Sequence, residues 1–220
     1  MPGSIAPDAG LGAIAHAFPE RTFPIVAVHE FISPAAAEAA ATNGFISGIL
    51  GKLMQQGGTC LWISDRRTIY PPALTLFGIH AERIIFLDLD KQKDVLWAIE
   101  EALKCEALTA VVGELRELSF TASRRLQLAV EQSRVTGLIH RYQPRSENTV
   151  ACVSRWKIRP LPSVLEDGMP GIGLPRWNVN LTKIRNGKPD TWQVEWSNGS
   201  FRLIPERFIA ISNTRTLKTG

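Results

Sequence analysis

The stretch VHEFISPAAAEAAATNGFISGILGKL (residues 28–53) decides the fold, because it reads as a strand, a run of small residues and a helix. This is the order of a phosphate-binding element, in which a loop between strand and helix wraps around the phosphates of a nucleotide. Ser33 and Pro34 are typical of the N-cap and first position of a helix. From Asn43 onward, apolar residues recur at helical spacing.

The small-residue run lacks what holds a triphosphate. Backbone N–H groups turn inward around phosphates where glycines adopt positive φ, and a lysine and a Ser/Thr hydroxyl then supply charge and a magnesium ligand. Residues 34–41 are PAAAEAAA instead: alanine resists positive φ, Pro34 has no N–H, and Glu38 repels phosphate. Lys52 lies too far into the helix to help. The segment 33–44 is therefore either an exposed linker or an arm that orders on a partner, and both interpretations stay open.

Two further positions that ATP hydrolysis needs are also altered. The strand TAVVGEL places Gly113 where a magnesium-binding aspartate is expected, with Glu114 beside it. The strand after the first helix ends in WISD, and two arginines follow Asp65, so we expect Asp65 to pair with one of them or to cap the next turn. The residues argue against an enzyme, and we expect no catalytic residue, no cofactor and no metal site.

Apolar runs of strand length alternate with helical patterns up to about residue 142, which predicts an α/β fold with a mostly parallel sheet flanked by helices. The strands are expected at residues 23–32, 59–64, 84–89, 108–115 and 136–142, and two further helices at 93–107 and 121–135, the last capped by Thr121 or Ser123. After Pro144 the residues alternate one by one, and RNGKPD and SNG mark hairpin turns, so antiparallel strands follow.

Tryptophans gather in the antiparallel part, and we expect them to pack the small sheet onto the rest of the chain rather than to stack on bases. They are Trp156, Trp177, Trp192 and Trp196. The patterns divide the chain into an N-terminal segment (1–22), an α/β core (23–162), an antiparallel extension (163–210) and a flexible tail (211–220).

The composition places further bounds on the protein. The 220 residues contain no stretch long and apolar enough to cross a bilayer, and MPGSIAPDAG at the N-terminus lacks the pattern of a secretory signal. We therefore expect a cytoplasmic protein without membrane contact. The cysteines, Cys60, Cys105 and Cys152, are expected to be buried free thiols.

The net charge of +4 permits an acidic partner or nucleic acid but does not demand one. Basic residues gather in the second half, and the candidates for contacts with a partner or with phosphate are Arg116, Arg124, Arg125, Arg141 and Arg145. Arg124 and Arg125 lie early in a helix, where the helix dipole disfavours cations. Salt bridges to Glu114 or Glu117 are the other interpretation of this pair.

Several phrases, in the same order and at the same spacing, resemble the ImuA family of bacterial damage-inducible mutagenesis proteins, which is similar in turn to RecA and to the SulA division inhibitors. They are FPIVAVHEF (23–31), LWISDRRTIYPPALTLFGIHAERIIFL (61–87), DVLWAIEEALKCEALTAVVGEL (94–115), LSFTASRRLQLAVEQSRVTGLIHR (118–141), SRWKIRPLPS (154–163) and PRWNVNLTKIRNGKPDTWQVEWSNGSFRL (175–203). The resemblance runs from about Gly12 to Leu203 and implies a RecA-like, P-loop-type core with C-terminal antiparallel hairpins.

The resemblance also implies a non-catalytic accessory protein of SOS-induced translesion DNA synthesis, associated with the nucleoid. Its expected partners are RecA and an ImuB-type relative of Y-family polymerases, with an error-prone polymerase III alpha-type subunit reached indirectly. The loops that face DNA in RecA-type proteins are short here, at residues 116–120 and 143–148, so at most weak nucleic-acid contact is expected. Two alternatives stay open: a SulA-like inhibitor that binds the division protein FtsZ, and a degenerate but working ATPase.

Overall fold

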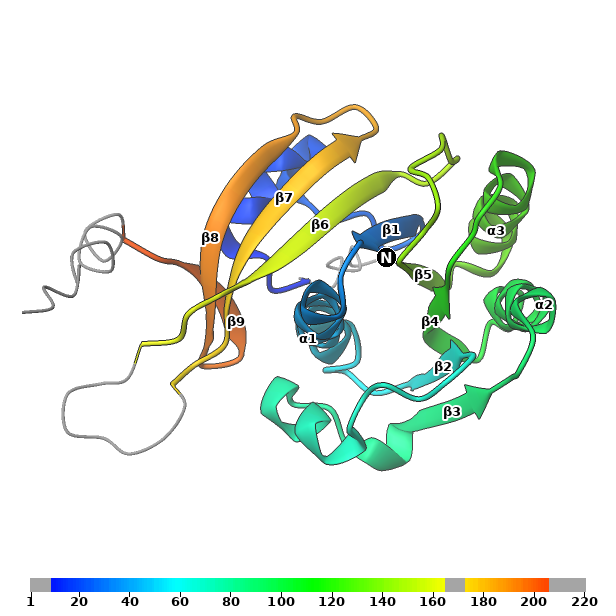
Figure 1. Ribbon diagram of the computed structural model, residues 1–220, viewed down its shortest axis with the longest axis horizontal. Coiled ribbons are helices and arrows are strands. Elements are labelled where there is room, and N and C mark those ends of the chain that lie inside the picture. The colour runs from blue at the N-terminus through cyan, green and yellow to red at the C-terminus, as the bar shows by residue number, and fades with distance from the viewer. Residues whose placement is uncertain (1–8, 165–172, 206–220) are drawn as a thin grey trace, which may run out of the picture.

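The computed structural model describes residues 9–164 and 173–205, which are built around a nine-stranded sheet in the order β3-β2-β4-β5-β1-β6-β7-β8-β9 (Figure 1). The strands are β1 (Val28–Ser33), β2 (Thr59–Ser64), β3 (Ile84–Asp88), β4 (Leu108–Leu115), β5 (Thr136–Tyr142), β6 (Ser154–Leu161), β7 (Arg176–Ile184), β8 (Asp190–Ser197) and β9 (Ser200–Leu203). Strands β3 to β6 of this order are parallel, and β6 to β9 are antiparallel. The predicted α/β class is confirmed.

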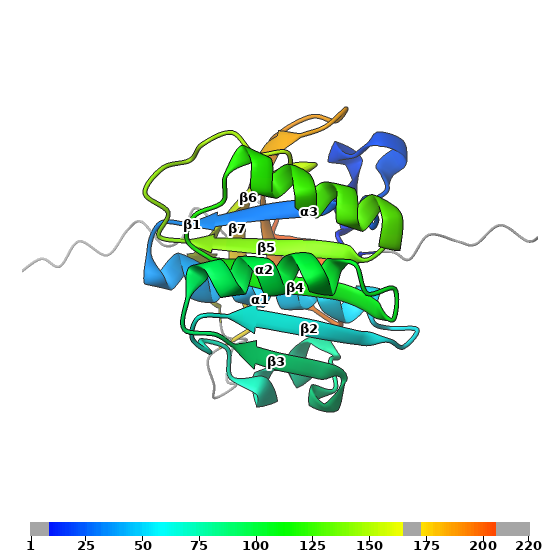
Figure 2. The same cartoon turned by 90° about the vertical axis from the view of Figure 1, so that its right-hand side faces the viewer.

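Helices cover both faces of the parallel strands. α1 (Ala36–Leu53) lies on one face, whereas α2 (Gln92–Leu103) and α3 (Phe120–Ser133) lie on the other (Figure 2). Each face has its own apolar core: Phe31, Phe45 and Trp156 belong to the cluster on the α1 side, and Val95 and Leu126 to the cluster under α2 and α3. Short 3₁₀ turns, η1 (Gly12–Ala17), η2 (Pro19–Arg21), η3 (Pro71–Phe77) and η4 (Ala81–Arg83), complete the described elements.

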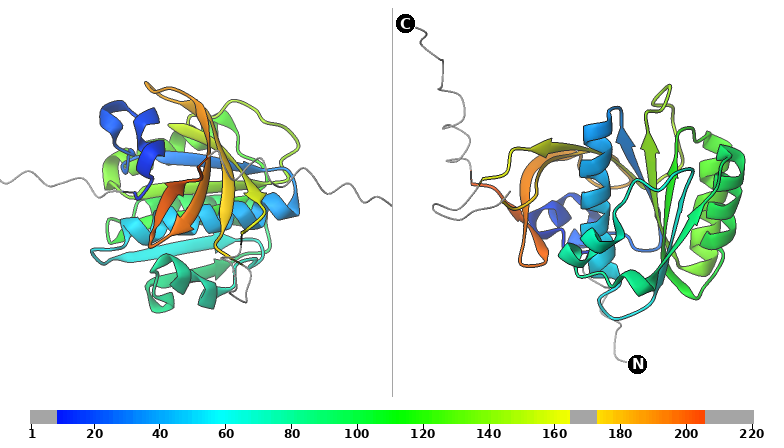
Figure 3. Two further views of the ribbon diagram at one scale, coloured as in Figure 1. Left: turned by 90° about the vertical axis from the view of Figure 1, so that its left-hand side faces the viewer. Right: turned by 60° about the horizontal axis from the view of Figure 1, so that its bottom comes forward.

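The antiparallel strands curl across α1, as the left-hand view of Figure 3 shows. Their inward side chains include Trp177, Trp196 and Phe201, which are buried in the same cluster as Phe45 of α1. A Cβ at Gly48 of α1 would lie 2.4 Å from the Phe201 ring, so only glycine allows this close approach. The prediction that the tryptophans pack the small sheet onto the chain is confirmed, with Trp192 partly buried against the same cluster.

The N-terminal segment contributes to the core rather than preceding it. Leu11, Ile14 and Phe18 are buried, and the backbone N–H of Phe201 donates to the carbonyl of Gly10. Strand β6 lies within the predicted core (23–162), yet it pairs antiparallel with β7 of the predicted extension as well as in parallel with β1, so the two predicted parts share one sheet. The predicted tail, residues 211–220, and most of the connector, residues 165–172, lie outside the described residues.

The predicted start of the first helix is wrong. Ser33 is the last residue of β1, Ala35 is the N-cap, and residues 36–44 are already helical, so the segment is neither a linker nor an arm. The reason is that alanine has the highest helix propensity, and Ala41 and Thr42 are buried against the sheet. Strand β1 is shorter than predicted because it begins at Val28 rather than at residue 23, although it ends one residue later, at Ser33.

Two smaller predictions are also corrected. Helix α3 is capped by Ser119, whose side chain accepts a hydrogen bond from the backbone N–H of Ala122, and not by Thr121 or Ser123. Cys60 and Cys152 are buried free thiols as expected, but Cys105 is exposed because it follows α2 in a turn. In the part of the chain that the structure describes, no helix is long and apolar enough to cross a membrane.

Candidate functional site

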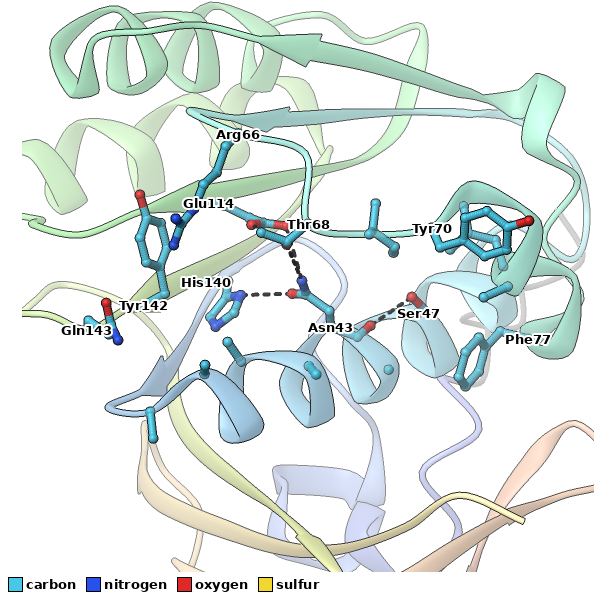
Figure 4. A pocket seen from close by; sticks show the side chains of 18 residues that line it. Asn43, Ser47, Arg66, Thr68, Tyr70, Phe77, Glu114, His140, Tyr142 and Gln143 are labelled. Carbon is cyan, nitrogen blue, oxygen red and sulfur yellow. Dashed lines mark hydrogen bonds between the residues drawn. The ribbon is translucent and has the colours of Figure 1, made fainter. Parts of the chain in front are cut away.

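A pocket of about 420 Å³ opens beside α1 near the carboxyl ends of the parallel strands (Figure 4). Its first wall is the outer face of α1, where Ala36 and Ala40 present no more than a methyl group each. The opposite wall is the loop after β2 and the turn η3, with Tyr70 and Phe77. The floor is polar. Such a mostly apolar hollow with a few polar groups is the usual form of a binding site in a protein.

The alternation of side chains along β4 and β5 points the polar floor residues, Glu114 and His140, into the pocket. Glu114 of β4 and His140 of β5 are register partners in neighbouring parallel strands, so both side chains leave the sheet on the α1 face. Gly113 faces the other way, and a Cβ there would lie 2.3 Å from Cδ1 of Ile99 in α2. The carboxylate of this strand end is therefore Glu114, and the expectation that position 113 is where an acid belongs is wrong.

Glu114 is buried, with only 2% of its surface exposed. Its Oε1 accepts hydrogen bonds from Trp62 Nε1 at 2.7 Å and from Asn43 Nδ2 at 3.3 Å, and its Oε2 accepts one from Thr68 Oγ1 at 3.3 Å. Burial raises the pKa of Glu114 to about 7, and these donors offset the rise only in part. Near neutral pH the carboxyl group is thus divided between its charged and its protonated form.

His140 is held neutral beside this carboxyl group. Its Nδ1 lies 2.8 Å from Oδ1 of Asn43, and its Nε2 lies 2.9 Å from the hydroxyl of Ser33. Because the amide oxygen can only accept, Nδ1 carries the proton and Nε2 accepts from Ser33, whose oxygen accepts in turn from Thr42 at 2.7 Å. Burial lowers the pKa of His140 to about 3. Asn43 therefore bridges a neutral imidazole and a carboxyl group, as the dashed lines in Figure 4 show.

At the mouth of the pocket, two positively charged arginine side chains lie over the ring of Tyr142. The guanidinium groups of Arg66 and Arg116 lie 5.6 Å and 5.3 Å from the ring centre of Tyr142. The Tyr142 hydroxyl donates to Asp65, which also accepts from Gln92 at 3.0 Å. The predicted pairing of Asp65 with a neighbouring arginine is therefore wrong, because the end of β5 brings Tyr142 and the start of α2 brings Gln92 to this carboxylate.

The backbone between β1 and α1 does not form a phosphate-binding loop. Only Pro34 and Ala35 lie between the last residue of the strand and the first of the helix. All of residues 33–44 are described, and none of them has a positive φ. The acidic residue of the first helical turn, Glu38, accepts a hydrogen bond from Arg159 at 3.2 Å. A cradle of inward N–H groups needs the left-handed conformations that this corner lacks.

The five arginines predicted to contact a partner or phosphate do not share one environment in the structure. Arg141 is fully buried and is therefore not a surface contact, contrary to prediction. It lies on the α3 face of β5, where it donates to Glu30 at 2.8 Å and to Asn148 Oδ1 at 3.0 Å. Glu30 also accepts from Arg155 at 2.5 Å. The cluster ties the ends of β1, β5 and β6 to the loop that follows β5.

The other four arginines are exposed and do not form one patch by contact with each other. Arg125 pairs with Glu100 at 2.5 Å, not with Glu114 or Glu117 as expected, because α3 packs beside α2. Of the predicted residues, only Arg116 reaches the mouth of the pocket, through Tyr142. Roles for Arg116, Arg124, Arg125 and Arg145 in partner contact stay predictions.

Sequence reasoning missed the pocket itself and the acid at its floor. A signal existed, because two polar residues end neighbouring apolar strands, Glu114 in VVGEL and His140 in GLIHRY. The alternation of residues puts both on the face opposite Gly113, which could have been read from the pattern. Within the described residues, no group of three His, Cys, Asp or Glu side chains could hold a metal ion.

Comparison with known proteins gives both a sequence relationship and a fold. Protein ImuA of Caulobacter vibrioides (strain NA1000 / CB15N) is 30% identical over 205 residues, which cover 88% of this chain and 84% of that protein. The cell division inhibitor SulA of Photorhabdus laumondii subsp. laumondii is 29% identical over 123 residues, or 54% of this chain and 70% of that protein. No family model matches the sequence.

Among solved structures, the RadB recombinase is similar, with a TM-score of 0.63 at 13% identity, over 90% of this chain and 100% of that one. At this identity the likeness shows the fold alone. The parallel strands with α1, α2 and α3 thus form a RecA-like core, and the predicted fold class is confirmed.

Proposed function

The chain belongs to the ImuA family, and from this premise we propose that it is an accessory factor of damage-inducible mutagenesis that binds other proteins and catalyses no reaction. Its partners in this proposal are an ImuB-type polymerase relative and RecA, with an error-prone polymerase III alpha-type subunit reached through them. The complex would act at the nucleoid in the cytoplasm.

One observation carries the non-catalytic part, namely the corner between β1 and α1. A triphosphate needs a loop of inward N–H groups, a lysine and a magnesium ligand. Here Pro34 and Ala35 are the whole loop, and Glu38 occupies the first turn of the helix. The nearby floor acid, Glu114, accepts from Trp62, Asn43 and Thr68, so each of its carboxylate oxygens already accepts at least one hydrogen bond from the protein. These features support a binding protein rather than an ATPase.

The exposed apolar side chains beside the pocket support the protein-binding part. Tyr70 is 70% exposed and Leu76 is 67% exposed, and both belong to the segment that forms the pocket wall opposite α1. Large apolar side chains that gather at a hollow in the surface are typical of protein interaction sites. Weak contact with nucleic acid is retained only as a secondary property of the exposed arginines.

The test is a binding measurement with purified proteins. The chain is titrated with ImuB and, separately, with RecA from the same bacterium, and complex formation is followed by analytical ultracentrifugation and calorimetry. The proposal expects a complex with at least one of them in the absence of nucleotide. Binding to neither protein would remove the proposed function.

A second candidate is a SulA-like inhibitor of FtsZ, favoured by the similarity to SulA over 54% of this chain. It predicts that the purified chain lowers the GTPase rate of FtsZ at stoichiometric concentration. The ImuA similarity covers 88% of the chain, which is why the mutagenesis role is preferred. An inhibited FtsZ together with no binding to ImuB or RecA would reverse this preference.

A further inference from the structure

The floor of the pocket, at Glu114, favours a group that can donate a hydrogen bond over an anion. Glu114 lines it from the floor, and Oε2 of Glu114 has a single hydrogen bond, a long one of 3.3 Å from Thr68. A carboxylate oxygen has two lone pairs, so this atom has capacity to accept one more donor. A phosphate or carboxylate placed there would meet a carboxyl group that is in part negatively charged near neutral pH, whereas a purely aliphatic group would leave the remaining lone pair of this buried oxygen without a donor.

The shape of the pocket favours a flat side chain. The methyl groups of Ala36 and Ala40 form a smooth wall on α1, and the rings of Phe77 and Tyr70 lie opposite (Figure 4). A volume of about 420 Å³ accommodates an aromatic side chain with room for part of the backbone that carries it. Aromatic side chains with a polar tip, which are tryptophan and tyrosine, combine this body with one donor.

The mouth adds a charge preference. Arg66 lines the pocket and stacks on Tyr142, and it makes no ion pair with an acidic side chain among residues 9–164 and 173–205. Its guanidinium group is exposed and therefore available to an acidic residue of an incoming segment. The exposed Tyr70 and Leu76 add apolar surface on the side of the wall opposite α1, which suits an occupant larger than a metabolite.

We propose that the pocket receives a tryptophan or tyrosine side chain of a partner protein, whose N–H or O–H donates to Glu114 while a neighbouring acidic residue pairs with Arg66. This inference rests on the proposed protein-binding function and names the chemistry of the segment that is bound. The anchoring ring lies between α1 and η3, and the rest of the segment passes over Tyr70 and Leu76.

The first experiment uses short capped peptides as probes: Trp-Glu-Glu, Leu-Glu-Glu and Trp-Lys-Lys. Binding to the full chain is followed by the NMR signal of the Trp62 indole N–H, assigned by its loss in Trp62→Phe. The peptide Trp-Glu-Glu is expected to bind about fivefold or more tightly than Leu-Glu-Glu, because a hydrogen bond to Glu114 is lost in the second. Trp-Lys-Lys is expected to bind more weakly than Trp-Glu-Glu, and Arg66→Ser is expected to remove that difference.

A matched pair of variants locates the binding. Ala40→Phe places a ring in the pocket, and Ala37→Phe places one on an exposed position of the same helix that does not line it. Both change alanine to phenylalanine at exposed helical positions, so their effects on folding are comparable. Ala40→Phe is expected to abolish the response to Trp-Glu-Glu, and Ala37→Phe to preserve it. No response in the unsubstituted protein, or an equal response in both variants, would overturn the inference.

Repeating the ImuB and RecA titrations with the two variants keeps the two proposals apart. If partner binding persists undiminished in Ala40→Phe, the pocket is not the docking site and the inference fails while the proposed function stands. If the unsubstituted protein binds neither partner, the proposed function fails whatever the peptides do. A loss of at least about tenfold in partner affinity in Ala40→Phe alone is the expected result.

Discussion

The indole Nε1 of Trp62 donates a 2.7 Å hydrogen bond to Oε1 of Glu114, and this bond joins neighbouring strands β2 and β4 beneath the pocket. No ion pair of the described residues involves Glu114. The acid is held in the interior by neutral donors, from Trp62, Asn43 and Thr68. A carboxyl group in such surroundings resists ionisation, and several measurable properties follow from this.

The variant Glu114→Gln should change how stability depends on pH. Since burial raises the pKa of Glu114 from 4.5 to about 7, the folded state holds a proton that the unfolded state releases. The carboxyl group therefore destabilises the protein increasingly as pH rises from about 4.5 to about 7, by up to about 3 kcal/mol. Glutamine does not titrate, so the variant should gain stability relative to the unsubstituted protein at pH 8 compared with pH 4.5. Urea unfolding at both values measures this, and an unchanged difference would contradict it.

Histidine 140 should make the protein sensitive to acid. Burial lowers the pKa of His140 from 6.5 to about 3, so the unfolded state binds a proton below pH 6.5 that the folded state excludes. Its contribution to stability is lost as pH falls from about 6.5, by up to about 1.4 kcal/mol per pH unit. His140→Gln, measured in the Glu114→Gln background, should flatten the slope between pH 6 and pH 4. The matched control is the same substitution at an exposed position, His16→Gln.

Gly113→Ala should destabilise the protein because the space beside Gly113 is occupied. The added Cβ would lie 2.3 Å from Cδ1 of Ile99, which is itself fully buried. Overpacking of this kind costs about 1–3 kcal/mol. The double variant Gly113→Ala with Ile99→Val removes Cδ1, the nearer of the two clashing atoms of Ile99, although Cγ1 at 2.7 Å remains, and it should be more stable than Gly113→Ala alone. If Ile99→Val merely adds its own cost to that of Gly113→Ala, the steric explanation is wrong.

Arg141→Met should show that Arg141 belongs to the core. Removing this guanidinium leaves Glu30 buried with Arg155 as its remaining cation, and breaking a buried pair typically costs about 3–5 kcal/mol. Adding Glu30→Gln removes the buried carboxylate that has lost one of its two cations and should restore part of the stability. Thermal unfolding checks both. A surface role for Arg141 would instead give a variant of normal stability with impaired binding to ImuB or RecA.

The sequence pattern predicted the parallel strands, the helices on both faces and the hairpins, because strong local signals and long-range packing agree there. The sequence pattern gave wrong predictions where a residue could bond either to a sequence neighbour or solvent, or to a residue on another strand. Ser33 looked like a helix cap, yet its hydroxyl bonds to His140, a residue distant in sequence. Arg141 looked like a surface cation, yet the alternation of β5 turns it toward Glu30. Such partners depend on strand order, which local patterns do not contain.

The most direct measurement for the central claim is a titration with ATP and magnesium, followed by backbone NMR signals of residues 34–44 and by thermal unfolding. A ligand that binds only the folded state at 100 times its Kd stabilises it by about 2.7 kcal/mol, which is readily detected. Because the corner between β1 and α1 lacks a phosphate cradle, we expect no saturable change in those signals and no rise in unfolding temperature at millimolar ATP. Saturable shifts confined to residues 34–44, together with a higher unfolding temperature, would contradict that expectation.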